Sequence, residues 1–161
     1  MPASDSRSFR RWFGTFATGV TVVTLKDGKG EAAGITINSL TSVSLAPPLL
    51  LFCLVRSARL YPAFRASKHF AVNILAEGQE YLSRYFADPR HHAVPENIWD
   101  RERKGCPILK GTLGWMVVER TAIYRGGDHD ILMGKPVGMH KRSGSMKPLL
   151  YFHSRYRKVA D

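Results

Sequence analysis

Cysteine is scarce in this chain of 161 residues. Its two cysteines, Cys53 and Cys106, lie far apart and form neither a CxxC pair nor a cluster with histidine. This spacing argues against a disulfide framework and against a structural zinc site. We therefore expect both thiols to be reduced, with Cys53 in the core, and we expect no bound metal.

Long hydrophobic runs are also missing. No stretch reaches the roughly 20 consecutive apolar residues that a membrane-spanning helix needs, and Met1–Arg11 is too polar for the hydrophobic region of a signal peptide. The chain is nevertheless 44% hydrophobic, which is enough for a core. The length suits one domain of about 100–200 residues. We expect a single soluble, cytoplasmic domain over residues 1–161, with no membrane partner.

Negative charge is in short supply, because 13 Asp and Glu face 24 Lys and Arg and leave a net charge of +11. Such an excess suits a nucleic acid, an acidic membrane or an anionic small molecule. The basic residues are dispersed, and no recognition helix or aromatic-basic RNA motif accompanies them. Nucleic acid is therefore the less favoured partner. The chain also has no GxGxxG after a strand, which argues against a Rossmann dinucleotide site.

The patterns that are present predict three helices. Aromatic residues recur at helical spacing near the N-terminus and predict an amphipathic helix over residues 4–17 whose apolar face packs on another element: Phe9, Trp12, Phe13 and Phe16. Ser57 predicts the cap of a short helix that runs toward Ser67 and is limited by Pro62. Residues 79–87 predict the last helix, with Leu82, Tyr85 and Phe86 on one face.

Strand patterns cover most of the remainder. They predict a hairpin over 20–37, a buried strand over 47–54, and further strands over 69–75, 112–125, 128–140 and 147–153. Pro136 predicts an edge or a bulge, because proline cannot donate to the ladder. Residues 88–111 show no regular pattern and predict a surface loop with a short turn or helix around residues 95–99, in which His91 and His92 face solvent. This count predicts a mainly β barrel or sandwich with two or three peripheral helices.

One segment combines polarity with a complete lack of charge. Between Thr36 and Arg56 there is no charged residue, yet small hydrogen-bonding side chains alternate with apolar ones: Thr36, Asn38, Ser42 and Ser44. Alternate residues of a strand share a face, so these groups predict a neutral polar shelf with NSLTS as the bend. Exposure to water is the alternative, but a water-facing strand in so basic a chain should carry charge. A flat, neutral ring ligand suits the shelf better.

Five motifs in order carry a resemblance that spans about residues 9–157. They are FATGVTVVT (16–24), ITINSLTSVSLAPPLLLFCL (35–54), HFAVNILAEGQEYLSRYFA (69–87), GDHDILMG (127–134) and PLLYFHSRYR (148–157). In this the chain resembles the flavin reductase-like family of small NAD(P)H:flavin oxidoreductases. The resemblance implies an FMN-binding split β-barrel of the antiparallel Greek-key type and a homodimer with flavin near the subunit interface.

The resemblance also implies a flavin site. The residues implied to contact the isoalloxazine and ribityl groups are Thr36, Asn38, Ser39, Ser42, Val43 and Ser44, whose donors and acceptors suit the edge of the ring. Ser57 and Arg59 resemble the part that meets the flavin phosphate. Ala76 and Gln79 match positions near the ribityl-phosphate, although a turn before a helix explains them equally well.

His129 of the GDH motif is the implied catalytic residue. In the family this histidine sits beside the nicotinamide and flavin N5, where it orients the dihydronicotinamide or stabilises the anionic reduced flavin, and Asp128 could fix its tautomer. Arg155 and Tyr156 are the implied nicotinamide contacts, through phosphate pairing and stacking. A purely structural strand histidine is the alternative for His129.

The implied activity is hydride transfer from NADH or NADPH to FMN or FAD, which supplies reduced flavin to a partner monooxygenase. One alternative is a flavoprotein of the same fold with another electron acceptor, such as ferric iron. The other is a non-enzymatic basic module that binds flavin or nucleic acid. The residues do not choose between FMN and FAD, or between NADH and NADPH.

Overall fold

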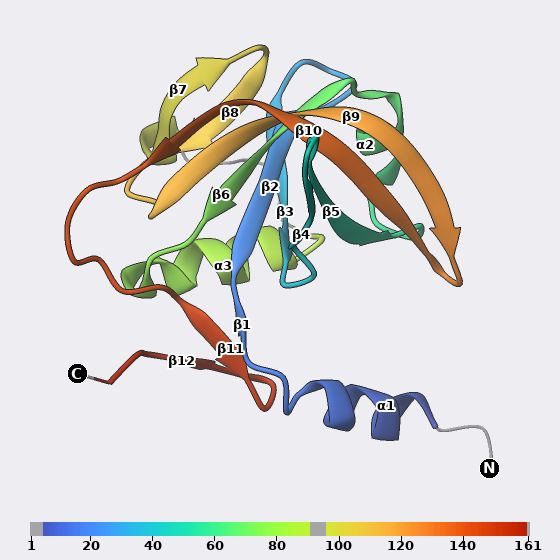
Figure 1. Cartoon of the computed structure of the whole chain (residues 1–161), viewed down its shortest axis with the longest axis vertical. Coiled ribbons are helices and arrows are strands. Elements are labelled where there is room, and N and C mark those ends of the chain that lie inside the picture. Colours follow the sequence, from blue (N-terminus) through green and yellow to red (C-terminus); the bar gives the residue numbers. More distant parts are fainter. Residues whose placement is uncertain (1–4, 91–95, 161) are drawn as a thin grey trace.

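A seven-stranded antiparallel sheet dominates the computed structural model, which describes residues 5–90 and 96–160 (Figure 1). The spatial order is β3-β2-β6-β9-β10-β5-β4. The strands are β2 (Thr21–Lys26), β3 (Ala32–Ile37), β4 (Thr41–Leu45), β5 (Pro48–Val55), β6 (His69–Ile74), β9 (Gly114–Gly126) and β10 (His129–Lys141). The hairpin over 20–37 and the strands that the β-branched and apolar runs predicted are thus confirmed.

Two smaller sheets and three α-helices complete the described part. One sheet joins β1 (Thr18–Gly19), β11 (Leu150–Phe152) and β12 (Arg155–Arg157), and the other pairs β7 (Trp99–Arg103) with β8 (Cys106–Leu109). The helices are α1 (Ser6–Phe13), α2 (Tyr61–Ala66) and α3 (Glu80–Ala87), with 3-10 turns η1 (Glu77–Gln79) and η2 (Glu96–Ile98). The mainly β prediction with two or three peripheral helices is confirmed.

The sheet curls because its longest pair, β9 and β10, is bulged. The register shifts between Met133 and Gly134 and again between Pro136 and Gly138, so the predicted bulge at Pro136 is confirmed. Gly134 is required by close approach, since a Cβ there would lie 2.7 Å from the carbonyl oxygen of Glu119. Bulges increase the local twist, and here they bend the long strands over the core (Figure 1).

The two edge strands, β3 and β4, are consecutive in sequence but stand at opposite ends of the sheet order. The bend 38–40 joins them and lies outside the paired residues of both strands. The described strands therefore form a curved, barrel-like sheet. Between β3 and β4 the chain connects the two edges, but no backbone hydrogen-bond ladder joins them. This split is where the uncharged NSLTS bend sits.

The main core lies between the curled sheet and α2. Phe52, Phe64 and Phe70 are fully buried, and their rings meet edge to face, with Phe52 and Phe70 centroids 5.2 Å apart. Edge-to-face pairs add to the burial energy of aromatic side chains. The helix starts at Tyr61, with Pro62 in its first turn, so the prediction that Ser57 caps it is wrong. Proline favours a helix start, and it sets this one later.

A second core packs α3 against β1, β11 and the β7–β8 hairpin. Leu82 and Phe86 of α3 are buried there beside Leu109 and Leu149, which confirms the predicted helix over 79–87. The hairpin itself corrects the prediction of a loop over 88–111. Only its second strand, β8, is apolar and buried. The first strand, β7, contains Arg101, Glu102 and Arg103 and therefore lacks the apolar alternation that predicts a strand. His91 and His92 lie outside the described residues.

The cysteine prediction is confirmed in part. Both thiols are free, but Cys106 is buried and Cys53 is half-buried. Burial raises the pKa of the Cys106 thiol to about 11, so this thiol stays protonated and acts as a small apolar core group. The expectation that Cys53 is the core cysteine is thus wrong, because its side chain lies on the less buried face of β5.

Helix α1 departs most from expectation. Asp5 caps it by accepting a hydrogen bond from the N–H of Arg7 (3.2 Å), and the carbonyl oxygen of Gly14 accepts from the N–H of His153 (2.7 Å). The aromatic side chains, however, stay 51–68% exposed: Phe9, Trp12, Phe13 and Phe16. Nothing in the described chain covers this face, so what the predicted apolar face packs on stays a prediction. The helix instead projects from the barrel and forms one wall of a groove (Figure 1).

Candidate functional site

A groove of about 990 Å³, which we call the His129 groove, lies between α1, the bend 38–40 and the start of β10. It combines an aromatic wall with neutral polar groups and His129. The lining residues that matter for its chemistry are Phe9, Phe13, Phe16, Asn38, Ser39, Thr41, His129, Tyr151 and Ser154. Four segments far apart in sequence therefore converge on one cleft, which is the arrangement expected of a small-molecule site.

His129 is the first residue of β10, directly opposite Val55 of β5. Its Nδ1 lies 2.7 Å from Oδ1 of Asp128. The hydrogen bond from His129 lowers the pKa of the Asp128 carboxyl below its usual range. The carboxylate accepts this bond, so Nδ1 carries a proton and Nε2 is left to interact with a ligand. The contact that was expected between Asp128 and His129 is thus present.

Arg56 holds the turn that presents His129. Its backbone N–H donates to the carbonyl oxygen of Asp128 (3.0 Å), and its guanidinium donates to that of Gly127 (2.7 Å). Gly127 adopts φ +66°, a conformation that favours glycine. The turn is therefore attached to the end of β5, and the position of the imidazole depends on this attachment.

The side chains of the predicted polar shelf, which we call the polar row, do not all line the same cavity. Asn38 is exposed and lines the groove, and so does Ser39, whose hydroxyl accepts from the N–H of Cys53 (3.0 Å) and reaches its carbonyl oxygen (3.3 Å). Thr36 donates to the carbonyl oxygen of Ser83 in α3 (2.8 Å). Ser39 and Thr36 thus also fix the bend and β3 in place.

The rest of the row lies on the edge strand β4. Ser42 lines a different groove, of about 730 Å³, together with Leu40, Thr41, Ile74, Met116, Met139 and Met146. Val43 is 47% exposed and Ser44 is half-buried. We call this second surface the methionine groove. The flavin contacts implied for Ser42, Val43 and Ser44 stay predictions.

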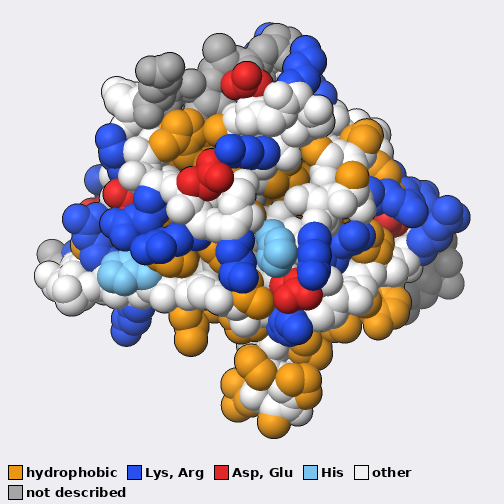
Figure 2. Space-filling model, turned by 90° about the horizontal axis from the view of Figure 1, so that it is seen from above, with side chains coloured by type: hydrophobic (Ala, Val, Ile, Leu, Met, Phe, Trp, Pro, Cys, Tyr) orange, Lys and Arg blue, Asp and Glu red, His pale blue; other side chains and the backbone are white. Residues whose placement is uncertain are grey.

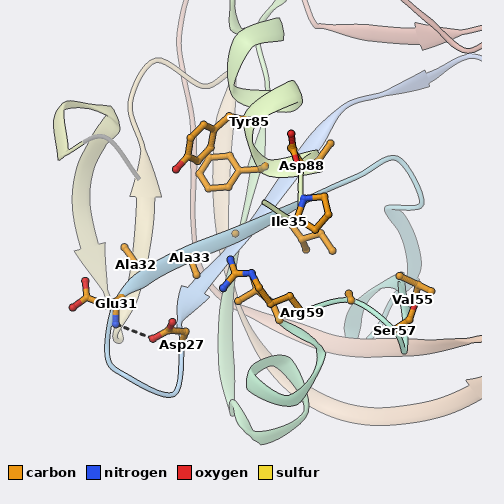
Figure 3. Close-up of a pocket in the computed structure, with 16 residues that line it drawn as sticks. Asp27, Glu31, Ala32, Ala33, Ile35, Val55, Ser57, Arg59, Tyr85 and Asp88 are labelled. Atoms are coloured by element: carbon orange, nitrogen blue, oxygen red, sulfur yellow. Dashed lines mark hydrogen bonds between the residues drawn. The ribbon is translucent and has the colours of Figure 1, made fainter. Parts of the chain in front are cut away.

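Ser57 and Arg59 line a third cavity of about 310 Å³, the Arg59 cavity, between β3, the 56–60 turn and the end of α3 (Figure 3). Burial raises the pKa of the Tyr85 hydroxyl in its wall, and the positive charge of Arg59 opposes this shift. The two predicted phosphate contacts are therefore together, and they share a cavity with an aromatic side chain.

Ala76 and Gln79 line none of these three cavities. The Gln79 amide is buried, donates to the carbonyl oxygen of Lys110 (2.7 Å) and accepts from the N–H of Ala76 (3.0 Å). This is the turn before α3 that was the alternative explanation, and its groups already have protein partners. A contact with the ribityl-phosphate remains a prediction.

The C-terminal strands place different residues at the groove from those expected. The Tyr156 hydroxyl lies 2.7 Å from the Ser83 hydroxyl, and the ring lies under the guanidinium of Arg84. Arg155 is exposed and is not among the lining residues. Tyr151 and Ser154 line the groove instead. Tyr151 pairs with Tyr156 across β11 and β12. Sequence reasoning did not predict Tyr151, because the resemblance implied nicotinamide contacts only for Arg155 and Tyr156.

The described residues give little support to a metal, membrane or nucleic-acid site. Within 5–90 and 96–160, no three His, Cys, Asp or Glu side chains are gathered to hold a metal ion. Among these residues no helix is both long and apolar enough to cross a bilayer. Lys and Arg side chains on the face in Figure 2 are scattered among neutral and apolar ones and form no single stripe.

Comparisons with known proteins agree on one family. The family described as "Flavin reductase like domain" matches residues 13–160. Two relatives come from Rhizobium meliloti strain 1021. "Probable flavin reductase" is 44% identical over 81% of this chain, and "Stachydrine N-demethylase reductase subunit Stc3" is 42% identical over 87%. The chain spans 42% of the first relative and 60% of the second.

A solved structure is similar over nearly the whole chain. "Streptomyces globisporus C-1027 NADH:FAD oxidoreductase SgcE6 in complex with NAD and FAD fragments" is 37% identical, has a TM-score of 0.87, and covers 97% of this chain and 93% of its own. The match therefore includes the sheet order, the bend and the C-terminal strands together. On its sequence and its split β-barrel fold, the chain belongs to the flavin reductase-like family.

Proposed function

We propose that this chain is an NAD(P)H:flavin oxidoreductase that passes hydride from NADH or NADPH to FMN or FAD in the His129 groove. The observation that carries the proposal is the meeting of Asn38, Ser39 and His129 in that groove. The relatives named as flavin reductase and NADH:FAD oxidoreductase support it. Reduced flavin then leaves for a partner monooxygenase, as the demethylase reductase subunit among the relatives suggests.

The residues present fit a flavin. An isoalloxazine is flat, neutral when oxidised, and carries both donors and acceptors along one edge. Asn38 offers an amide donor and acceptor at the groove, while Phe9, Phe13 and Phe16 offer apolar cover. When bound, the flavin supplies the hydride acceptor, and the protein supplies binding, orientation and electrostatics.

The protein's own contribution is positional. Asp128 orients His129, Arg56 holds the turn, and the Ser39–Cys53 hydrogen bonds hold the bend that faces it. His129 Nε2 is then a fixed hydrogen-bonding group beside the nicotinamide and the ring. Hydride transfer requires reacting atoms about 3–3.5 Å apart, so rigid walls on both sides of the groove favour the reaction. Ser57 and Arg59 bind the flavin phosphate, and Arg155 remains a candidate for the phosphate of the nicotinamide nucleotide.

We further propose a homodimer. Uncovered apolar side chains gather around the methionine groove and the adjacent β4–β5 hairpin, where Leu45 is 91% exposed and Met139 is 71% exposed. Patches of this kind mark interaction sites. A second copy is the natural occupant, because Leu40 and Thr41 line both this groove and the His129 groove. The dimer interface would thus lie next to the bound flavin. The two free thiols favour a cytoplasmic location.

The test of the activity is NADH oxidation by the purified protein with and without added FMN or FAD, followed by the loss of NADH absorbance. We expect oxidation that depends on flavin. Oxidation of NADH with ferric citrate in the absence of flavin would favour ferric iron as the electron acceptor. If NADH is not oxidised under any of these conditions, the proposed enzymatic activity is overturned. A duplex DNA titration at several salt concentrations separates the nucleic-acid alternative, whose affinity should fall steeply with salt.

A further inference from the structure

A fourth cavity, which we call the Trp115 pocket, lies where the β7–β8 hairpin meets the start of β9 and the end of β10 (Figure 1). Its volume is about 410 Å³, within the range of about 300 to 1,000 Å³ that ligand pockets occupy. It shares no lining residue with the His129 groove or the Arg59 cavity. The proposed activity therefore leaves this pocket without a role.

Positive charge gathers at the Trp115 pocket. Lys110 and Arg142 line it with exposed side chains, and neither forms an ion pair with an Asp or Glu of the described residues. Asp100 also lines the pocket, but the guanidinium of Arg101 pairs with its carboxylate (Nε–Oδ2 2.5 Å). The charges of Lys110 and Arg142 stay uncompensated, and they attract an anion.

The turn between β8 and β9 adds backbone donors to the same wall. Gly111 adopts φ +71°, a conformation that favours glycine. The N–H groups of Lys110 and Leu113 fix the two ends of the turn by donating to backbone carbonyl oxygens at 2.9 Å. Those of Gly111 and Thr112, between them, donate to no acceptor among the described residues. Successive N–H groups around a left-handed residue form anion-binding concavities.

The pocket also has an aromatic wall. Trp115 of β9 and His140 of β10 are register partners, and their ring centroids lie 6.0 Å apart with planes at 31°. A flat ring beside cations favours a planar organic anion over a bare inorganic ion. Trp115, His140 and Arg142 also line the methionine groove, so a ligand here would lie at the edge of the proposed dimer interface.

We propose that the Trp115 pocket binds a small aromatic carboxylate, a single ring that carries one carboxylate group. The ring lies against Trp115. The carboxylate accepts hydrogen bonds from Arg142 and Lys110 and from the N–H groups of Gly111 and Thr112. A guanidinium and a carboxylate match in a planar, bidentate geometry, which gives this anion an advantage over phosphate once the ring is also in contact. The site goes beyond the proposed function, because it is separate from the groove assigned to flavin.

Isothermal titration calorimetry with benzoate tests the proposal, with acetate and inorganic phosphate as anions that lack the ring. We expect the unmodified chain to bind benzoate about tenfold more tightly than either. Arg142→Gln should weaken benzoate binding by about tenfold or more, and Trp115→Leu by about threefold or more. Arg103→Gln is the matched control and should keep full affinity. It removes one positive charge at the other end of the same hairpin, opposite Cys106 and outside the pocket.

A flavin titration separates this site from the His129 groove. Saturating benzoate should leave the dissociation constant of FMN unchanged, because the two sites share no lining residue. Competition between benzoate and FMN would put the acid in the flavin groove and overturn the proposal.

Three further results would also overturn it. They are an unmodified chain that binds no benzoate, acetate or phosphate that binds as tightly as benzoate, and an Arg142 variant, folded by circular dichroism, that keeps full benzoate affinity. Arg142 is exposed, so this variant decides the question if Trp115→Leu does not fold. The benzoate titrations involve no hydride transfer, so a chain that binds benzoate but oxidises no NADH keeps this site and loses the proposed activity.

Discussion

At the scale of single residues, His129 is held by one side chain and one strand end. Asp128 accepts from Nδ1 at 2.7 Å, and the backbone carbonyl of Asp128 accepts from Arg56. Both hydrogen bonds lie at the turn before β10, and the His129 side chain is still 42% exposed. A group so placed has little to do in the core, where no described cluster includes it. Its position is explained by a ligand better than by packing.

His129→Ala should therefore slow hydride transfer and leave folding and flavin affinity nearly unchanged. We expect a loss of about 10–100-fold in the rate, because misplaced reacting groups cost up to about that much. Single-turnover stopped-flow measurements of flavin reduction, with a flavin titration alongside, check both parts. His69→Ala, a half-buried histidine at the start of β6 that lines none of the four cavities, is the control. Full rate in the His129 variant would remove it from the mechanism.

Sequence reasoning picked out some of the residues that line the His129 groove and overlooked others, for one physical reason. Side chains on a strand alternate, but a motif does not say which alternate set faces the ligand. Asn38 and Ser39 were found because they lie in a bend, where alternation no longer applies. Tyr151 was missed in favour of Tyr156, which pairs across from it and is turned toward Ser83. Phe9 and Phe13 were recognised as a stripe, but nothing local shows what a stripe faces.

At the scale of elements, Asn73 joins three strands. It is fully buried on β6, its amide donates to the carbonyl oxygen of Val22 (3.1 Å) and the hydroxyl of Thr24 (3.0 Å), and it accepts from the N–H of Leu109 (3.0 Å). Thr24 in turn donates to the carbonyl oxygen of Pro107 in β8. This network attaches the β7–β8 hairpin to the centre of the large sheet.

Asn73→Ala should lower the free energy of unfolding by about 2–4 kcal/mol, because it leaves several buried partners unsatisfied. Urea denaturation followed by tryptophan fluorescence measures the loss. Asn97→Ala, at an exposed position in η2, should change stability by less than about 0.5 kcal/mol. Equal effects for the two variants would mean that the hairpin is held by apolar contacts alone.

The elements that sequence predicted share a clear period. Apolar residues recur without interruption in β2, β3, β5 and α3. The contacts that these elements make with distant segments agree with the structure that the local pattern predicts. The β7–β8 hairpin could not be predicted, since Trp99–Arg103 is mostly charged and its buried partners, Cys106 and Ile108, follow a turn of Lys104 and Gly105. Its stability comes from Asn73 and the neighbouring core, which no window of local sequence contains.

At the scale of the whole molecule, the described chain leaves large apolar side chains uncovered, and this supports the proposed dimer. The aromatic face of α1 and the β4–β5 hairpin both carry exposed large apolar side chains. Fold class followed from the strand count, but the arrangement of two copies does not follow from any pattern within one. Leu45 of the hairpin is the better position for a test, because it is not among the residues that line the His129 groove.

Leu45→Asp should convert the proposed dimer to a monomer. The leucine is 91% exposed in one chain, so folding loses nothing, whereas each copy of a symmetric interface would lose about 1.5–3 kcal/mol of burial. We expect the dimer dissociation constant to rise about 100-fold or more, as measured by analytical ultracentrifugation. Val159→Asp, 39% exposed near the C-terminus, is the control. A Leu45 variant that stays dimeric would place the interface elsewhere.

The split between β3 and β4 also has a kinetic consequence. Edge strands open more easily than central ones, and here the two edges meet at a bend that no ladder crosses. Amide hydrogens near residues 38–45 should exchange with solvent faster than those of β6 and β9 at the sheet's centre. Because Asn38–Thr41 line the His129 groove, a flavin bound there as proposed should slow this exchange, while exchange in β6 and β9 should stay unchanged.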